Sequence, residues 1–399
     1  MLLAAGWAVV AAQLPDSTWV ALKQLPQQGR LAVFGLAVDP SNNQSLVAGS
    51  SAGSLLKSGD GGSSWSVVYR GKAQFSTIVF SPLKAGLVLA GTVRSGALVS
   101  QDGGATWSPA AGLDSRTVRV FGFALTMLAA GTDHGVYVSQ DGTTWTSAGL
   151  ATYSIDALAV QAIHDPVRLV VGSDSQASRV GLSLFQSPDG GVTWSPFTPP
   201  ISGTFTVKLA SGPLPPTGDT RPLVVGTNAG LFQTTDNGST FMPLSGGDLL
   251  PSTDYTQVAF VTDHFDRFYA ASDGGGSGSG GLWRTSDGGA SFSSMNAPVP
   301  TVTALAVSND ETPILYIATL NPTSHVAALW AFHDTGGLPL GPAGGPSPGA
   351  SGARTTTPSA GSSPLDALRA PQLPYLLLGA AALILLLSAG VAHLRGRRR

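Results

Sequence analysis

Short apolar runs of four to eight residues recur along most of this chain, and turns rich in Gly, Asp and Ser separate them. The first group predicts four strands, at Leu31–Val38, Ser45–Gly49, Ser54–Lys57 and Ser64–Tyr69. Runs of this length bounded by turn residues are typical of strands, not helices. The pattern repeats after Phe75, so we predict an all-β fold built from repeated units of four strands.

One phrase marks each repeat, and its clearest copy is Ser100-Gln101-Asp102-Gly103-Gly104-Ala105-Thr106-Trp107-Ser108. Asp-Gly between two apolar runs predicts a tight hairpin turn, in which Gly supplies a positive φ and Asp bonds to amides two residues on. The aromatic residue then anchors the next strand. The Asp and aromatic positions of the six copies are Asp60 and Trp65, Asp102 and Trp107, Asp141 and Trp145, Asp189 and Trp194, Asp236 and Phe241, and Asp287 and Phe292.

The spacing between the copies predicts the architecture. Successive Asp positions are 42, 39, 48, 47 and 51 residues apart, which suits a β-propeller with one four-stranded blade per repeat. After the sixth copy, Val302–Val307, Ile314–Ala318 and Ala327–Phe332 predict three further strands. The fourth strand of that blade is expected from the N-terminus, at Thr18–Leu22. We therefore predict a single seven-bladed propeller over residues 16–334, with six blades as the alternative.

The repeated phrase resembles the Asp-box, or BNR, motif S-x-D-x-G-x-T-W. This motif marks sialidase-like propellers, sortilin-type receptors, some xyloglucan hydrolases and the photosystem II assembly-factor family. The resemblance covers roughly residues 16–334. Because the motif is structural in all these families, the resemblance implies the fold and leaves the activity open.

Catalytic residues do not carry over from these families. The sialidase resemblance implies an arginine triad, a Tyr–Glu pair and an Asp acid, but the only Glu is Glu311, in a predicted turn, and no early Arg-Ile-Pro is present. Xyloglucan hydrolases use two Asp residues and join two propellers, whereas this chain has one. We predict no catalytic residue, and a divergent glycoside hydrolase, sialidase-like or xyloglucan-hydrolase-like, remains the alternative function.

No cofactor and no metal site is predicted. Gly274–Gly281 is rich in Gly but lacks the Lys-Ser/Thr and helix of a phosphate loop. The chain contains no Cys, and each copy of the phrase has one acidic residue, whereas calcium loops need several converging oxygens.

The ends of the chain differ from the repeats. Residues 1–12 are apolar and resemble a signal peptide, with a buried N-terminal strand as the alternative. Residues 335–373, rich in Gly, Pro and Ser, predict a flexible stalk. Residues 375–394 are almost entirely apolar and long enough for a transmembrane helix, and residues 395–399 form a basic tail. Positive charge stays cytoplasmic, so we expect a single-pass protein of the cell membrane with the propeller outside; a cell-wall sorting signal is the alternative.

Charge suggests where a partner binds. Without the four Arg residues of the tail the net charge is −6, which gives no general attraction to nucleic acid. In a propeller, the loops between second and third strands share a face with the connections between blades. We place a candidate basic cluster there, and the alternative is dispersed solubilising charge. Its members are Arg70, Lys72, Arg94, Arg116, His134 and Arg179.

The sequence thus favours a membrane-anchored extracytoplasmic propeller that acts as a non-catalytic protein-binding or assembly scaffold. Its partner is an unknown protein or glycan, and an acidic partner suits the candidate basic cluster. A purely structural surface protein is a further alternative.

Overall fold

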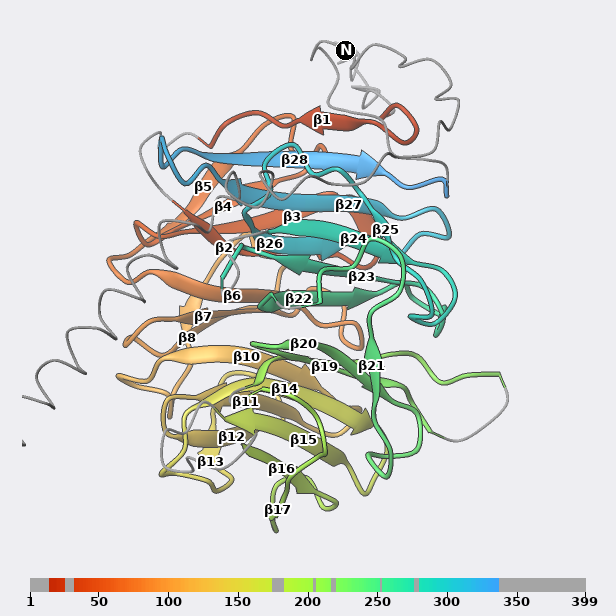
Figure 1. Ribbon diagram of the computed structural model, residues 1–399. Helices are drawn as coiled ribbons and strands as arrows, with labels where there is room; N and C mark the ends of the chain where they lie inside the picture. Colours follow the sequence, from red (N-terminus) through yellow and green to blue (C-terminus); the bar gives the residue numbers. More distant parts are fainter. Residues whose placement is uncertain are drawn as a thin grey trace, which may run out of the picture. The chain divides into compact units, whose positions relative to one another are not determined.

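The computed structural model describes residues 14–25, 32–173, 183–203, 206–216, 220–251, 253–275 and 280–336. These residues form β-strands, labelled β1 to β28, and turns, which confirms the all-β prediction (Figure 1). Within these ranges no helix is long and apolar enough to cross a membrane. The predicted signal peptide, the stalk after Gly336, the transmembrane helix and the basic tail lie outside the described residues.

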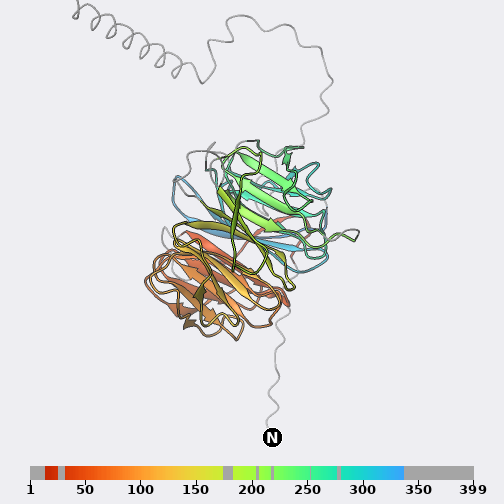
Figure 2. The same cartoon turned by 90° about the horizontal axis from the view of Figure 1, so that it is seen from below.

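The strands form seven four-stranded antiparallel sheets, so the prediction of seven blades is confirmed. Figure 2 shows the same strands from below. Blade 1 contains β2 (Val33–Asp39), β3 (Asn42–Ser50), β4 (Ser54–Ser58) and β5 (Ser66–Arg70). Blade 2 contains β6 (Phe75–Phe80), β7 (Val88–Thr92), β8 (Ala97–Ser100) and β9 (Ser108–Pro109). Blade 3 contains β10 (Val118–Phe123), β11 (Leu128–Thr132), β12 (Gly135–Ser139) and β13 (Thr146–Ser147). Blades 4 and 5 contain β14 (Ile155–Ala162), β15 (Arg168–Ser173), β16 (Ser183–Ser187) and β17 (Ser195–Phe197); and β18 (Thr206–Ser211), β19 (Leu223–Thr227), β20 (Gly230–Thr234) and β21 (Met242–Leu244). Blade 6 contains β22 (Tyr255–Phe260), β23 (Phe268–Ser272), β24 (Gly281–Thr285) and β25 (Ser293–Ser294), and blade 7 contains β26 (Val302–Val307), β27 (Ile314–Leu320), β28 (Ala327–His333) and β1 (Trp19–Ala21).

Blade 7 is completed from the N-terminus, as predicted. β1 pairs antiparallel with β28, and Trp19 is the register partner of Phe332. Figure 1 shows the red N-terminal strand beside the blue last strand. The Trp19 side chain is fully buried, and its Nε1 donates to the carbonyl of Met295, 2.8 Å away. Because strands from both ends share one sheet, the two ends of the ring are held together by a complete hydrogen-bonded ladder.

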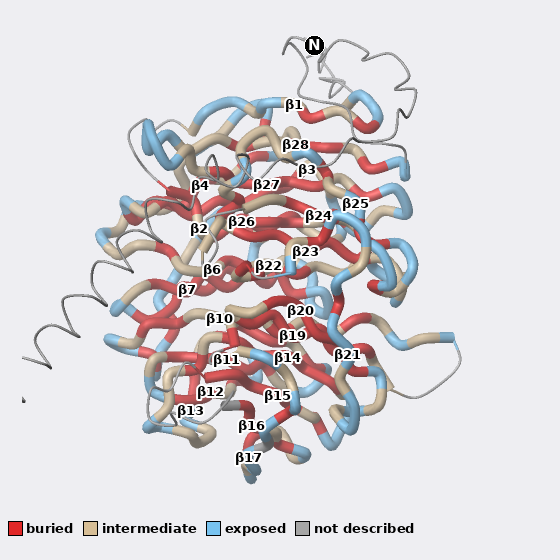
Figure 3. Tube along the Cα trace, in the orientation of Figure 1, coloured by how far each residue is buried: buried red, intermediate tan, exposed pale blue. Residues whose placement is uncertain are grey.

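The blades pack closely because small residues lie where the second strand of one blade meets the first strand of the next. A Cβ added to Gly91 in β7 would lie 2.5 Å from the carbonyl oxygen of Val118 in β10. A Cβ added to Gly172 in β15 would lie 2.5 Å from Cβ of Thr206 in β18. The central strands are accordingly buried along most of their length, and exposure is confined to the loops and outer edges (Figure 3). The Gly at the end of the predicted second strands is therefore required by the packing between blades.

The six Asp positions of the repeated phrase lie in turns between third and fourth strands, and we call these the Asp turns. In the second blade, Oδ1 of Asp102 accepts the amide of Thr106 at 2.9 Å and Oδ2 accepts its hydroxyl at 2.6 Å. The Ser100 hydroxyl donates to Asp102 and accepts the amide of Gly104. These hydrogen bonds, with those from Thr106 largest, lower the pKa of Asp102 to about 2.

The prediction that each turn Asp bonds to the amide two residues later is wrong for most of the Asp turns. In five Asp turns, the carboxylate bonds to the residue four positions later. The exception is Asp141, which bonds to Thr143, because its turn is one residue shorter and has one Gly. In the second blade, two successive residues of positive φ, Gly103 and Gly104, make the turn long enough for the extra reach.

Blade 7 has an Asp at the position of the turn Asp, but its carboxylate bonds to a different part of the protein. Because Phe332 has the ladder position of Ser100, Asp334 falls where the other blades have the turn Asp. Its buried carboxylate instead bonds to the preceding blade: Nη1 of Arg284 lies 2.6 Å away, Nη2 of Arg267 lies 3.0 Å away, and the Tyr269 hydroxyl donates to it. This cluster fastens the end of β28 to blade 6.

Candidate functional site

Hydrogen bonds between loops define the two faces of the ring. On one face, the amide of Gly96 in the β7–β8 loop donates to the carbonyl of Arg116, between blades 2 and 3, at 2.8 Å. On the other, the amide of Gly103 in an Asp turn donates to the carbonyl of Gly86, between β6 and β7, at 2.8 Å. We call the first the loop face and the second the turn face.

The predicted basic residues that the structure describes lie in loop-face segments. Arg70 ends β5, Lys72 follows it, Arg94 lies in the β7–β8 loop, Arg116 precedes β10, and His134 lies in the β11–β12 turn. Arg179 lies outside the described residues. Arg116 is half-buried, whereas Arg70, Lys72, Arg94 and His134 are exposed. Of these residues, Arg94 alone lines the pocket at the mouth of the channel described below.

Every inner strand carries a β-bulge at the same place. The register shifts after the first paired residue in all seven, for example between Val118 and Val120 in β10. A bulge re-aims side chains, and here its extra residues form an upper ring near the loop face. The upper ring is Phe34, Ser76, Arg119, Asp156, Val207, Thr256 and Thr303. The next residues form a second ring: Gly35, Thr77, Val120, Ala157, Lys208, Gln257 and Ala304.

The inner strands of all seven blades enclose a central channel with a cavity of about 240 Å³. Arg119 of β10 forms an ion pair with Asp156 of β14 and also donates to the Ser154 hydroxyl. The side chains of Arg119 and Asp156 are 34% and 20% exposed, so both still face the channel space. Lys208 of β18 lines the same cavity. Burial among the inner strands lowers the pKa of Lys208.

A wider pocket of about 510 Å³ lies at the loop-face mouth of the channel. Arg94 and Arg119 bring two guanidinium groups to it, and Asp133 brings one carboxylate. Phe34 and Gln74 supply an aromatic ring and an amide. Arg94 has a φ of 61°, a conformation that L-residues rarely adopt. Its amide donates to the Thr117 hydroxyl at 3.1 Å, which holds this strained turn at the mouth.

Sequence reasoning missed the channel residues because it searched the loops. Arg119, Asp156 and Lys208 each lie near the start of an otherwise apolar or small-residue strand. A charge within a predicted inner strand is unusual, since such strands are enclosed by neighbours. A charged residue within a predicted inner strand is therefore the sequence feature from which the channel residues could have been predicted.

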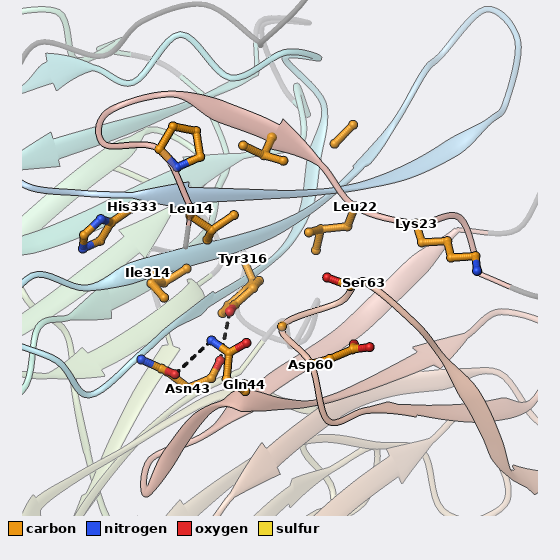
Figure 4. Close-up of a pocket in the computed structure, with 14 residues that line it drawn as sticks. Leu14, Leu22, Lys23, Asn43, Gln44, Asp60, Ser63, Ile314, Tyr316 and His333 are labelled. Carbon is orange, nitrogen blue, oxygen red and sulfur yellow. Dashed lines mark hydrogen bonds between the residues drawn. The ribbon is translucent and has the colours of Figure 1, made fainter. Parts of the chain in front are cut away.

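A second cavity, of about 550 Å³, lies on the turn face where blade 7 meets blade 1 (Figure 4). Leu14, Leu22 and Ile314 give it an apolar wall. Part of its polar lining is already paired: the Tyr316 hydroxyl donates to the carbonyl of Asn43 at 2.9 Å, and the Gln44 amide donates to Oδ1 of Asn43 at 3.1 Å. Lys23, Asp60 and His333 also line this cavity, so it carries charged groups of both signs.

One like-charged pair lies on the loop face. Asp254 precedes β22 and Asp273 follows β23. Burial, and then the charge of Asp273, raise the pKa of Asp254. Oδ1 of Asp254 is buried and has no hydrogen-bond partner among the described residues. Within those residues, no group of three or more His, Asp or Glu side chains is placed to hold a metal ion.

Solved structures of known proteins share this fold. A structure of YCF48 bound to D1 peptide is 17% identical, with a TM-score of 0.56, over 80% of this chain and 99% of that one. YCF48 from Cyanidioschyzon merolae is 16% identical, with a TM-score of 0.52, over 79% of this chain and 98% of that one. The GH74 xyloglucanase from Xanthomonas campestris is 14% identical, with a TM-score of 0.58, over 79% of this chain.

This chain spans only 56% of the xyloglucanase, whereas it spans nearly all of YCF48. No protein-family model matches the sequence. The comparison with curated proteins gave no match either. At these identities the likeness concerns the fold, and function has to be argued from the site.

Proposed function

We propose that this protein is a membrane-anchored extracytoplasmic β-propeller that acts as a non-catalytic protein-binding scaffold. The observation that carries the proposal is the loop-face mouth pocket, where Arg94 and Arg119 face about 510 Å³ of open space beside one carboxylate, Asp133. A guanidinium group binds a carboxylate well because it can donate two parallel N–H hydrogen bonds to the two oxygens. The partner is therefore expected to present an acidic segment to this face.

The comparisons support binding of a polypeptide. YCF48, a propeller of the same fold that this chain spans almost completely, has been solved with a peptide bound. The exposed Arg70, Lys72 and His134 lie in segments of the same face. The charges of Arg70 and Lys72 attract an acidic partner over a distance and accelerate association, whereas the pocket gives specificity. The apolar run at residues 375–394 supports the anchor.

A peptide-binding measurement tests this function. The full chain is titrated with a fluorescent acidic decapeptide and with its Asn/Gln analogue, followed by anisotropy. Arg94→Ala is expected to weaken acidic-peptide binding about tenfold, equivalent to ~1.4 kcal/mol. Lys84→Ala, an exposed cation between β6 and β7 on the turn face, is the matched control and should bind as the original chain does. Equal binding of both peptides, or equal loss in both variants, contradicts the proposal.

A divergent glycoside hydrolase is the second candidate, favoured by the xyloglucanase fold likeness and by the carboxylates Asp254 and Asp273. A raised pKa suits a general acid, and a neighbouring carboxylate suits its partner. Incubating the full chain with xyloglucan and measuring reducing ends tests this candidate. Hydrolysis that Asp254→Asn abolishes and Asp114→Asn preserves would favour the enzyme over the scaffold.

A further inference from the structure

Lys208 differs from Arg119 and Asp156 of the upper ring because the second ring, to which it belongs, contains no carboxylate. The remaining members of the second ring are Gly35, Thr77, Val120, Ala157, Gln257 and Ala304. Among the described residues, no ion pair includes Lys208. Lys208 is half-buried and lines the channel cavity, so an anion in that cavity would lie close to its ammonium group.

The inner strands offer the Lys208 ammonium no polar group on the side of the turn face. Two residues after the second ring, the inner strands carry only small or apolar residues: Ala37, Val79, Gly122, Ala159, Ala210, Ala259 and Ala306. A lysine extends its charged end toward polar surroundings when it can. Here those surroundings are the upper ring and the channel cavity.

A further polar group in the same cavity lacks a partner. Thr256 lies in the upper ring, and its Oγ1 is buried without a hydrogen-bond partner among the described residues. In the same ring, Ser76 and Thr303 donate their hydroxyls to carbonyls of the next blade, those of Val118 and Val33. Thr256 lines the same cavity as Lys208, and rotation about its χ1 would turn this unpaired hydroxyl toward a ligand there.

Charge and size restrict the ligand. The described cavity lining contains Arg119, Lys208 and Asp156, a formal total of one positive charge. One negative charge neutralises it, whereas a dianion would leave a buried charge uncompensated. The cavity of about 240 Å³ holds a small molecule and a few waters.

We propose that the central channel binds a single small carboxylate between the ammonium of Lys208 and the guanidinium of Arg119, with the Thr256 hydroxyl as a further donor. The carboxylate belongs to a free monocarboxylic acid or to the acidic group of a bound polypeptide, which present the same chemistry. The site goes beyond the proposed scaffold function, because a free acid would occupy it without any protein partner.

Chemical modification of the full chain tests the site without any substitution. Lys208 and Lys84 are reductively methylated with formaldehyde and dimethylamine-borane, reagents that release no carboxylate, and the extent at each is measured by mass spectrometry. Propionate is expected to slow methylation of Lys208 at least fivefold in a saturable way, and to leave Lys84 unchanged. Propionamide, the neutral isostere, and chloride at equal ionic strength should not protect. Protection by propionamide or chloride equal to that by propionate overturns the proposal.

An acidic tripeptide and propionate, compared in the same assay, distinguish the two sources of the carboxylate. If an acidic tripeptide with blocked ends protects Lys208 and propionate does not, the site takes a polypeptide side chain. If propionate protects, the site takes a free acid. Protection by neither refutes the site, whatever the loop face binds.

A substitution checks the assignment. Lys208→Met removes the charge and keeps an unbranched side chain one atom shorter; it should abolish the heat of propionate binding in calorimetry, whereas Lys84→Met should retain it. If Lys208→Met does not fold, Thr256→Val is used, and a several-fold weaker propionate affinity is expected. Unchanged affinity in the folded variant counts against the assignment.

Discussion

Trp19 and Phe332, from opposite ends of the described chain, are register partners across β1 and β28, with ring centroids 4.9 Å apart. Both side chains are fully buried, and Trp19 also bonds to the carbonyl of Met295 in the preceding blade. This contact joins the two ends of the ring and also ties blade 7 to blade 6.

Trp19→Ala is expected to lower the free energy of unfolding by about 3–5 kcal/mol, because it leaves a large cavity in a fully packed interface. Trp19→Phe keeps most of the ring and loses the bond from Nε1 to Met295, which should cost about 1 kcal/mol. Urea denaturation followed by far-UV circular dichroism measures both. If the Ala variant unfolds at the original urea concentration, β1 does not close the ring.

Gly91→Ala should destabilise the protein by about 1–3 kcal/mol, because the new methyl group would lie 2.5 Å from the backbone oxygen of Val118. Gly59→Ala is the matched control, since nothing lies within 4 Å of its added Cβ, and should change stability by less than about 0.5 kcal/mol. The two melting temperatures are compared directly. Similar melting temperatures for both variants would show that the blades separate to accommodate the methyl group.

The Asp turns make stability depend on acid. The pKa values of Asp102, Asp141 and Asp236 are about 2 in the folded protein, against about 3.9 in an unfolded chain. The stabilisation from these carboxylates is therefore fully present above about pH 4 and is lost as the pH falls toward 2. Urea midpoints measured from pH 2 to 7 should decline in that window.

The triple substitution of these three Asp residues by Asn is expected to lower the urea midpoint at pH 7 and to reduce the decline between pH 4 and 2. Asp114→Asn, at an exposed position, serves as the control and should follow the original curve. An undiminished acid decline in the triple variant would assign the acid sensitivity to other groups.

Asp334→Ala should cost about 3–5 kcal/mol, because it leaves Arg267 and Arg284 next to a buried site without its carboxylate. The effect is measured by urea denaturation, with Asp114→Ala as an exposed control. A double-mutant cycle with Arg284→Ala isolates the pair and should show coupling of at least about 1 kcal/mol. Additive losses would mean that the two residues stabilise the protein separately.

The blades and their closure could be predicted from sequence because their signals are local. The run after Ser17-Thr18-Trp19 reads as the second half of a repeat, and the run ending at Phe332 reads as the first half. Joining the halves requires no knowledge of long-range packing. The same logic placed the small residues of the second strands at close contacts between blades.

The channel could not be predicted in the same way because it depends on the bulges. No residue type marks the bulge position, which is Phe34 in one blade and Asp156 in another. Without the bulge, strict alternation would not bring Arg119 of the upper ring and Lys208 of the second ring into one cavity. The long reach of the Asp102 carboxylate was missed for a similar reason, since it follows from turn length and not from residue type.

The pairing of β1 with β28 also sets an order on synthesis. A ribosome makes Trp19 before the strands of blades 1 to 6 and its partner Phe332 only after them. Throughout that interval the indole has no sheet to enter, and blade 6 shows its unpartnered side to solvent. Until Phe332 is made, the open ring exposes an apolar blade face at each end, so a chaperone that binds the chain in that interval would cover surface that the closed ring buries.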